Sequence, residues 1–321
     1  MISVNKSKLR KVLKGIGVTI IIYIAVSILV TKFVYDFVFR PYTPDVTEEF
    51  STVEIPREAT CASFSYMCGE NFLSSRLYTG EEPGKGLIVI APGFRSQRTE
   101  YECLIYAFLQ EGFDVFAFDA TGHGESGGKS SVGFPQIIVD VDATLKFIES
   151  NDNFGHDDIF LLGYSRGGYG ICCAMNDHPN ITAAVSVNGM DTSMDAIMAL
   201  TTSYVGGIAY INYPFLDIYE DFIFGRTVAE KSAVAEINNT EIPVLIIQSE
   251  NDEQLSGGDY SIYSNKEKVT SANTEFLLYG RDGFDGHTTI LYNEENQPNY
   301  DIVKIISDFY IQKMKDKDLL Q

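Results

Sequence analysis

The fold of this chain is decided by the stretch Asp158-Ile159-Phe160-Leu161-Leu162-Gly163-Tyr164-Ser165-Arg166-Gly167-Gly168. Its first half is a short apolar run of the kind that forms a buried strand. The residues that follow, 170–175, predict a helix packed on that strand. Glycines two residues before and two residues after the serine indicate a turn so tight that a Cβ at either position would clash. Such a turn holds the Ser165 hydroxyl above the sheet, where it can act as a nucleophile.

The pentapeptide pattern around Ser165 occurs a second time, at Gly124-Glu125-Ser126-Gly127-Gly128. The apolar run before this copy, Val115 to Asp119, ends several residues earlier. Residues 127–131 contain two glycines and two serines, so they are a poor start for a helix. We therefore predict that Ser126 lies in a loop and that Ser165 is the nucleophile.

The first 40 residues differ in composition from the remaining chain. Five basic residues between positions 6 and 14 precede an uncharged apolar run from Gly15 to Thr31. This run is slightly shorter than the about 20 residues of a membrane span, but Lys32 can snorkel so that residues 33–35 add apolar length. The segment predicts an uncleaved, single-pass cell-membrane anchor, with the basic tail in the cytoplasm and the remaining chain outside it. The alternatives are a signal peptide cleaved near residues 25–27 and a buried core helix.

Residues 41–56 contain three prolines and four acidic residues, and they predict a linker that leaves the membrane. One large domain with a full core is then expected over residues 57–321. Residues 41–321 carry 17 basic and 43 acidic side chains, a formal net charge of −26. This balance argues against nucleic acid as a partner, because phosphate binding needs a basic surface. It also argues against a domain that lies flat on anionic lipids.

The five cysteines have no spacing typical of a metal site, and no metal or cofactor is expected. Cys172 and Cys173 fall on the predicted helix after Ser165 and are expected to fill the core. Cys61 and Cys68 flank the first predicted hairpin, and whether they form a disulfide outside the cytoplasm is left open.

Short apolar runs alternate with helical periodicity along the predicted domain. A hairpin is expected over residues 63–66 and 72–78, and apolar strands over 87–91, 115–119, 159–162, 183–188, 244–248 and 275–278. Apolar residues at helical spacing predict helices over 134–148 and 302–310. This order predicts an α/β fold with a mostly parallel central sheet and helices on both faces.

An insertion at about residues 190–241 interrupts this alternation. It is rich in aromatic residues, and we expect it to form a small cap over the site with some of these rings lining an apolar acyl or aryl pocket. The alternative is that the rings bury the insertion against the domain. The aromatic residues are Tyr204, Tyr210, Tyr213, Phe215, Tyr219, Phe222 and Phe224.

Further segments match motifs of one superfamily in the right order. Residues 119–126 match the pattern D-x-x-G-H-G-x-S, and residues 242–252 match I-P-V-L-I-I-x-G-x-x-D except that Ser249 replaces the glycine. The other matching segments are the loop at 92–96, the Ser165 turn and Gly286-His287-Thr288-Thr289. On these segments the chain resembles the α/β-hydrolase superfamily over about residues 57–315. The resemblance is greatest to the branch that contains monoacylglycerol lipases and serine aminopeptidases.

The resemblance implies a catalytic base among the four histidines. His156 in a polar turn and His178 at the end of a helix are not placed to reach the carboxyl ends of the strands. His123 corresponds to a structural histidine of the superfamily. His287 follows the last strand, at the position of the superfamily's catalytic base, and is the predicted base.

The acid of the triad is expected between Ser165 and His287 in the chain. The resemblance aligns Asp252 with the superfamily's aspartate. Glu250 is its nearest competitor, and Asp191 after the preceding strand is a less common position for the acid.

Two main-chain N–H groups are expected to form an oxyanion hole. One is the amide of Arg166, directly after the serine, and the other is the amide of Phe94 in the loop Pro92-Gly93-Phe94-Arg95-Ser96. Pro92 stands where many relatives have histidine. Loss of one such donor typically raises the barrier by about 2.7–4 kcal/mol.

The resemblance implies a serine hydrolase that needs no cofactor and acts on a small-molecule or lipid-like acyl substrate. We expect hydrolysis of carboxylic esters through an acyl-enzyme. The alternatives are a serine aminopeptidase or dipeptidyl-peptidase-like enzyme and a catalytically silent binding protein on the same fold. A carboxylate cluster that could hold a substrate ammonium keeps the peptidase open, namely Asp191, Asp195, Asp217, Glu220 and Asp221.

Overall fold

The computed structural model describes residues 6–44, 59–151, 154–255, 260–293, 295 and 297–320. The strands are β1 Thr60–Cys68, β2 Asn71–Thr79, β3 Leu87–Ala91, β4 Asp114–Phe118, β5 Ile159–Tyr164, β6 Ile181–Val187, β7 Val244–Ser249 and β8 Thr274–Tyr279. The α-helices are α1 Lys6–Val38, α2 Glu102–Gln110, α3 Gln136–Glu149, α4 Arg166–Ala174, α5 Ser193–Val205, α6 Ala209–Phe224, α7 Arg226–Ala229, α8 Ala233–Asn238 and α9 Tyr300–Leu320.

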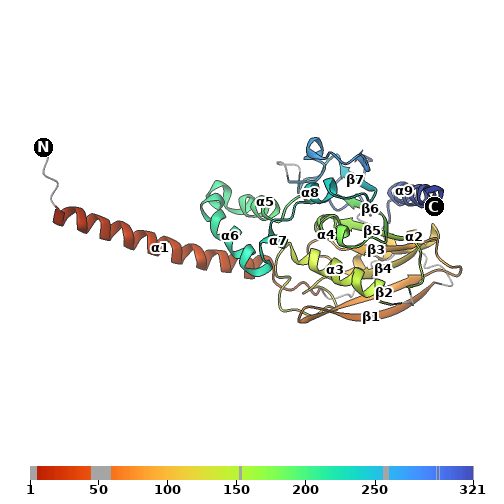
Figure 1. Ribbon diagram of the computed structural model, residues 1–321, viewed down its shortest axis with the longest axis horizontal. Helices are drawn as coiled ribbons and strands as arrows, with labels where there is room; N and C mark the ends of the chain where they lie inside the picture. The colour runs from red at the N-terminus through yellow and green to blue at the C-terminus, as the bar shows by residue number, and fades with distance from the viewer. Residues whose placement is uncertain are drawn as a thin grey trace.

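All the strands form a single sheet in the order β1-β2-β4-β3-β5-β6-β7-β8. The pairs β1–β2 and β2–β4 are antiparallel, and the other pairs are parallel. The residues of β3 to β7 are almost all buried, because helices cover both faces (Figure 1). This arrangement confirms the predicted α/β fold with a mostly parallel sheet.

Alternate side chains of each strand pack into two separate hydrophobic cores. Leu87 and Val89 of β3 face the core shared with α3 and α4, whereas Ile88 and Ile90 face the core shared with α2 and α9. Because β3 to β7 are parallel, their carboxyl ends share one edge of the sheet. Groups that follow these strands in the chain therefore come together at that edge.

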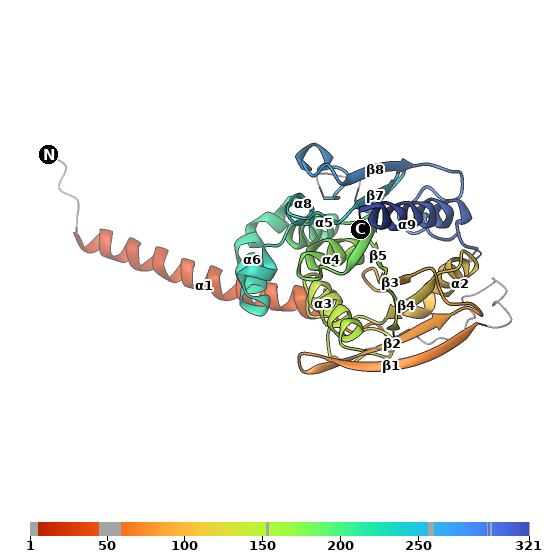
Figure 2. The same ribbon diagram turned by 45° about the vertical axis from the view of Figure 1, so that its right-hand side comes forward.

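The insertion between β6 and β7 forms α5 to α8, which lie on the side of the sheet nearest α1 (Figure 1, Figure 2). These helices make up the predicted insertion, and its role as a cap over the site stays a prediction. Some of their aromatic side chains pack against other parts of the protein, and others are exposed. Phe215 and Tyr219 contact rings of α1, whereas Tyr204 and Phe222 are largely exposed.

Helix α1 projects far beyond the domain, but its carboxyl end is built into the domain (Figure 1). Tyr35 and Phe39 are buried in the core that contains α3 and α4. The Phe39 carbonyl accepts a hydrogen bond of 2.8 Å from the amide of Ser131. The Tyr42 amide then donates to the Gly122 carbonyl at 2.9 Å. Only residues 41–44 of the predicted linker lie within the described residues.

Cys61 and Cys68 do not form a disulfide. Both lie on β1, where their separation of seven positions in an extended strand is about 23 Å. A disulfide needs Cα atoms within about 7 Å. Cys172 and Cys173 are buried in α4, as expected.

Candidate active site

Ser165 lies in a strained turn between β5 and α4. Its φ of 53° and ψ of −115° are unusual for a residue with a side chain. A Cβ on Gly163 would lie 2.4 Å from the Gly167 carbonyl oxygen, and one on Gly167 would lie 2.0 Å from that of Ala91. Both glycines are therefore required, and the turn leaves Ser165 only half-buried while its neighbours on both sides are buried.

Substitution of Gly167 by alanine is expected to destabilise the fold. The new methyl group would overlap the β3 backbone, which cannot move without disturbing the sheet, so a loss of at least about 1–3 kcal/mol in the free energy of unfolding is expected. The Gly80→Ala variant is the matched control, because among the described residues the nearest neighbour of a Cβ there is an oxygen at 4.0 Å. Urea denaturation of both variants measures the difference. Equal midpoints would contradict the steric argument.

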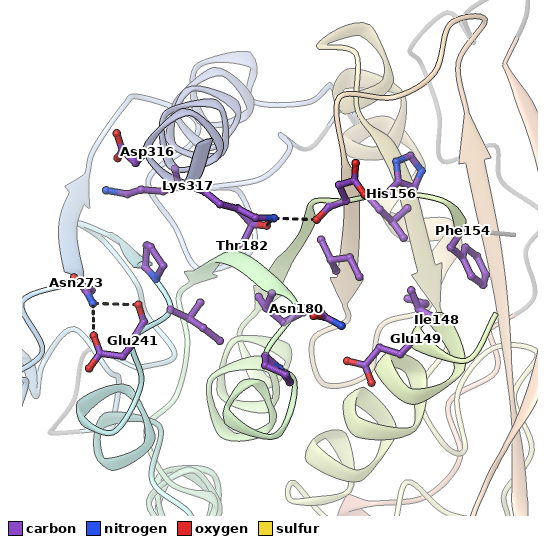
Figure 3. A pocket seen from close by; sticks show the side chains of 18 of the residues that line it. Ile148, Glu149, Phe154, His156, Asn180, Thr182, Glu241, Asn273, Asp316 and Lys317 are labelled. Carbon is purple, nitrogen blue, oxygen red and sulfur yellow. Dashed lines mark hydrogen bonds between the residues drawn. The ribbon is translucent and has the colours of Figure 1, made fainter. Parts of the chain in front are cut away.

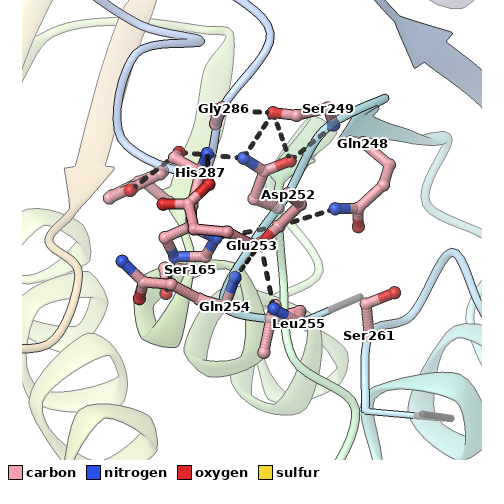
Figure 4. A network of polar contacts seen from close by, with 12 residues as sticks. Ser165, Gln248, Ser249, Asp252, Glu253, Gln254, Leu255, Ser261, Gly286 and His287 are labelled. Carbon is pink, nitrogen blue, oxygen red and sulfur yellow. Dashed lines mark hydrogen bonds and ion pairs between the residues drawn. The ribbon is translucent and has the colours of Figure 1, made fainter. Parts of the chain in front are cut away.

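Three side chains from separate segments form a continuous hydrogen-bonded chain (Figure 4). The Nε2 atom of His287 lies 3.0 Å from Ser165 Oγ, and its Nδ1 atom lies 2.8 Å from Asp252 Oδ2. Asp252 and His287 are both buried. With a proton on Nδ1, the imidazole donates to the carboxylate and Nε2 is free to accept the serine proton.

The carboxylate of Asp252 is held by several donors in addition to His287. Oδ1 accepts the main-chain N–H groups of Gln254 and Leu255, each at 2.9 Å. Oδ2 also accepts from the side-chain amide of Gln248 at 2.7 Å. Burial disfavours the charged carboxylate and by itself would raise the pKa of Asp252. The hydrogen bond from His287, the charge of that ring and the two main-chain amides have the larger effect, and they hold the pKa of Asp252 below its usual range. The carboxylate is thus charged at neutral pH.

The loop that carries His287 is tied to the ends of three strands. The His287 carbonyl accepts from the Tyr164 hydroxyl and from the Asn188 side-chain amide, both at 2.9 Å. The Ser249 hydroxyl donates to the Gly286 carbonyl at 2.9 Å and also contacts Asn188 (Figure 4). The hydroxyl that replaces the family's glycine is therefore one of the groups that position the loop.

Sequence reasoning did not find Asn188, Gln248 or Tyr164. Tyr164 is the last residue of β5, Gln248 is the second-last residue of β7 and Asn188 follows β6. Tyr164 and Asn188 act through long-range contacts that no local motif marks, whereas Gln248 contacts Asp252 four positions later. The signal for Asn188 is its φ of 48°, a left-handed conformation that asparagine tolerates, and this is visible only in the structure.

The loop after β3 lies beside the serine turn. A Cβ on Gly93 would contact the Tyr164 ring at 2.9 Å, and the Arg166 guanidinium donates to the Gly93 carbonyl at 3.3 Å. Among the described residues, no acceptor faces the amide N–H of Phe94 or of Arg166. Both amides are thus available to an external oxygen near Ser165, and their role as an oxyanion hole stays a prediction.

The Arg166 side chain is fully buried under this loop. Its guanidinium carbon lies 5.7 Å from the centre of the Phe94 ring. Burial lowers the pKa of Arg166 to about 10, and the nearby Asp140 carboxylate opposes that shift. The side chain therefore holds the loop through the Gly93 carbonyl and the Phe94 ring.

The competing candidates lie elsewhere or have other partners. The Ser126 hydroxyl donates to the Asp119 carbonyl at 2.6 Å and accepts the Ser74 amide, as a loop residue would. His123 is fully buried with Nδ1 at 3.0 Å from the Thr121 carbonyl. Burial lowers its pKa to about 3, which fixes the ring in its neutral form.

Neither alternative acid contacts His287 in the described structure. The Asp191 carboxylate accepts from Ser232 Oγ at 2.7 Å and from the Val234 amide at 3.0 Å, at the start of α8. Glu250 is exposed and packs against Gly280. Of the three candidate acids, only Asp252 reaches the ring.

A cavity of about 1170 Å³ lies at the opposite edge of the sheet (Figure 3). It is lined by the first residues of β3, β5 and β6 and by the end of α9. His156 at its edge lies 3.1 Å from Asp114, and Lys317 donates to Asp158. The cavity is therefore remote from Ser165. Within the described ranges, no group of three or more His, Cys, Asp or Glu side chains is placed to hold a metal ion.

Residues 82–205 match the family described as serine aminopeptidase, S33. The matched segment includes Phe94, Ser165 and Arg166 but ends before Asp252 and His287. No curated protein sequence matches the chain.

Several solved structures resemble this one at low sequence identity. An esterase from Pyrococcus furiosus has a TM-score of 0.60 and 19% identity over 85% of this chain and 98% of its own. Est1E from Butyrivibrio proteoclasticus, solved with ferulic acid bound, has a TM-score of 0.57 and 16% identity over 78% and 99%. The α/β-hydrolase GrgF from Penicillium has a TM-score of 0.57 and 14% identity over 80% and 99%. These likenesses show a shared fold.

Proposed function

We propose that this chain, a member of the α/β-hydrolase superfamily, is a membrane-anchored serine hydrolase that cleaves carboxylic esters. The observation that carries the proposal is the position of His287, with one ring nitrogen 3.0 Å from Ser165 and the other 2.8 Å from Asp252. In this arrangement the ring can move a proton while a buried carboxylate stabilises the positive charge that results.

The reaction then proceeds in two halves. His287 Nε2 accepts the hydroxyl proton as Ser165 Oγ attacks the acyl carbon, and the carbonyl oxygen becomes an oxyanion near the amides of Phe94 and Arg166. His287 next gives its proton to the departing alcohol oxygen, which leaves an acyl-serine. Water, deprotonated by His287, attacks this ester, and return of the proton to Ser165 releases the carboxylic acid.

The cap carboxylates favour an ester over an aminopeptidase substrate. Asp191 is occupied at the start of α8. Asp195 accepts from the Thr192 hydroxyl at 2.7 Å, and Glu220 accepts from the hydroxyls of Ser193 and Tyr35 at 2.6 and 3.0 Å. Three of the five carboxylates are thus engaged within the protein instead of facing a substrate ammonium. The name of the Pyrococcus structure, an esterase, points the same way.

Helix α1 supports retention of the segment as an anchor. Residues 7–38 are apolar and long enough to cross a bilayer, and only 6% of the most apolar 18-residue segment is buried inside the protein. Cleavage near residues 25–27 would remove Tyr23, whose hydroxyl donates to the Ile211 carbonyl at 2.8 Å and whose ring packs on Phe215. The basic residues before Gly15 favour an orientation with the amino terminus in the cytoplasm and the catalytic domain outside it.

The proposal is tested by labelling the full chain with a fluorophosphonate probe. The wild-type protein should be labelled, because the probe phosphonylates an activated serine, and the Ser165→Ala variant should lose the label completely. The Ser126→Ala variant is the matched control, since it carries the second copy of the pattern, and it should keep the label. Labelling of Ser165→Ala would contradict the nucleophile assignment. Absence of labelling in the wild type would favour a silent binding protein.

Substrate class is decided in a second assay. A panel of p-nitrophenyl esters and aminoacyl-anilides should show hydrolysis of the esters with kcat/KM well above that for the anilides. Preferential hydrolysis of the anilides would support the peptidase alternative.

A further inference from the structure

The tip of the cap is an uncharged helical pair beside the proposed membrane anchor. Residues 196–216, between Asp195 and Asp217, contain no charged side chain. They form most of α5, a tight turn at Gly206–Ile208 and the first half of α6. Several apolar side chains of this pair point outward, since Tyr204, Ile208 and Ile211 are 76%, 70% and 60% exposed. Such a surface is unusual on a domain that faces only water.

The tip lies beside α1, on the side of the domain from which α1 projects (Figure 1, Figure 2). Several contacts join α6 to α1. Tyr23 contacts Ile211 and Phe215, Thr31 accepts from Asn212 at 2.8 Å, and the Tyr35 hydroxyl donates to Glu220. The first half of α6 is therefore held against the stretch of α1 from Tyr23 to Thr31.

The position of Tyr23 fixes the depth of the tip. The uncharged run from Gly15 to Thr31 is about 26 Å long as a helix, close to the about 30 Å of a bilayer's hydrocarbon core. Tyr23 lies about 12 Å before Thr31 along this helix. The Ile211 carbonyl oxygen accepts a hydrogen bond from the Tyr23 hydroxyl. This oxygen must therefore lie at the depth of the lipid acyl chains when α1 spans the membrane.

Residues 193–224 taken together are long and apolar enough to cross a bilayer, but the structure divides them into α5 and α6, each of which is too short to do so. They have 13 and 16 residues, against the about 20 that a span needs, and the glycine turn folds one back on the other. Within the turn, the amide of Gly206 donates to the Thr202 carbonyl and that of Ala209 to Gly206 and Gly207. These hydrogen bonds satisfy main-chain groups that would otherwise be costly to place in lipid.

An apolar groove of about 610 Å³ separates the tip from α1. Val26, Val30 and Phe33 line one wall, and Val205 and Ile208 line the other. Val34 and Val38 also line the groove, and they pack against the core that contains Tyr35 and Phe39. Ring contacts lead from Tyr35 through Phe39 to Phe94, with centroid distances of 5.0 and 5.7 Å. The groove thus opens at membrane depth and is continuous in packing with the loop beside Ser165.

We propose that the α5–α6 tip is embedded in the extracytoplasmic leaflet and that the groove between it and α1 holds an acyl chain of a bilayer lipid. This inference rests on the proposed membrane anchor. A lipid chain fits the groove because both of its walls are apolar and one wall is the spanning helix itself. The acidic domain disfavours anionic headgroups, so the lipid is a zwitterionic or neutral one.

Depth-dependent fluorescence quenching tests the insertion in the full chain. Cys61 is the one exposed cysteine, so Cys61→Ser gives a background for single cysteines that carry an environment-sensitive fluorophore. Probe sites are Ile21 in α1, Ile208 in the tip and Leu319 at the far end of α9, which are 67%, 70% and 84% exposed. The protein is placed in phosphatidylcholine vesicles that contain spin-labelled phosphatidylcholine.

We expect loss of fluorescence at Ile21 and Ile208 and none at Leu319. Quenching at Ile21 without quenching at Ile208 would overturn the inserted tip and leave the anchor intact. Absence of quenching at Ile21 would overturn the anchor and the inference together, without bearing on the fluorophosphonate result. Since all three sites are exposed, the variants should fold, and thermal melts check this.

Photocrosslinking identifies the occupant of the groove. Phosphatidylcholine with a diazirine on its acyl chain should label peptides from residues 201–216. Labelling confined to the amino-terminal half of α1 would overturn the lipid site. A Val205→Cys variant tests a second copy of the chain as the occupant. Disulfide-linked dimers of this variant at low protein density, together with an absence of lipid labelling, would assign the groove to a second copy and overturn the lipid site.

Discussion

Replacement of His287 by glutamine is expected to lower kcat for a p-nitrophenyl ester by on the order of 10⁶-fold, with little change in KM. Glutamine can accept a hydrogen bond from Ser165, but its amide cannot take the proton that the serine must lose. The residual rate would come from the oxyanion amides and substrate binding alone. Single-turnover kinetics with the full chain in vesicles separate the acylation step from product release.

The matched control for this variant is His156→Gln. His156 lies at the edge of the large cavity on the opposite side of the sheet and contacts Asp114, so its loss should leave kcat within a few-fold of the wild type. A small effect at His287 together with a large one at His123 would move the base to the loop after β4. Unfolding curves show whether an inactive His123 variant is folded, because that ring is fully buried.

The sheet could be predicted from sequence because each strand of the parallel part is a continuous apolar run. The predicted 87–91 coincides with β3, and the predicted 159–162 differs from β5 only at its end. There the strand continues through Gly163 and Tyr164 to the turn, since Tyr164 pairs with Val187 of β6. Strand order was not predictable, because it depends on packing between elements that are distant in the chain.

The candidate site was predictable only to the extent that its residues follow strands. Ser165, Asp252 and His287 each come after a strand, and the structure brings their side chains within hydrogen-bonding distance. The groups that position them are not marked in this way. Asn188 connects β6 to Ser249 and to the His287 loop, and these contacts join residues that are 61 and 99 positions apart.

The junction between the anchor and the domain was the least predictable feature. Prolines and acidic residues after position 40 indicate a linker, but nothing in the sequence shows that Tyr35 and Phe39 complete the domain's core. The same holds for Tyr23, whose apolar neighbours mark it only as part of a membrane span. Its contact with Ile211 connects the anchor to the cap and thereby to the site.

Replacement of Asp252 by asparagine is expected to lower kcat by about 10⁴-fold while the protein stays folded. The main-chain amides of Gln254 and Leu255 bind Oδ1, so the oxygen of an asparagine would take that place. Its NH₂ group would then occupy the position of Oδ2 and donate to His287 Nδ1. The ring would be forced into the tautomer with its proton on Nε2, which cannot accept the proton of Ser165.

The control for this variant is Glu250→Gln, which removes the competing carboxylate on the same loop and should keep nearly full activity. Equal losses in the two variants would contradict the assignment of Asp252. Nitrogen-15 NMR of the histidine ring reads the tautomer directly, so a loss of activity through misfolding is distinguished from a loss through the wrong tautomer.

The pH dependence of stability gives an independent test of the same carboxylate. The pKa of Asp252 is lower in the folded protein than the about 3.9 of an unperturbed aspartate, so the folded state favours its charged form. Its contribution to stability is therefore complete above the unfolded value and is lost as the pH falls through the lower, folded value. The difference in free energy of unfolding between wild type and Asp252→Asn should shrink as the pH falls below about 4. A difference that keeps growing below about pH 4 would mean that the folded state does not favour the charged form of Asp252.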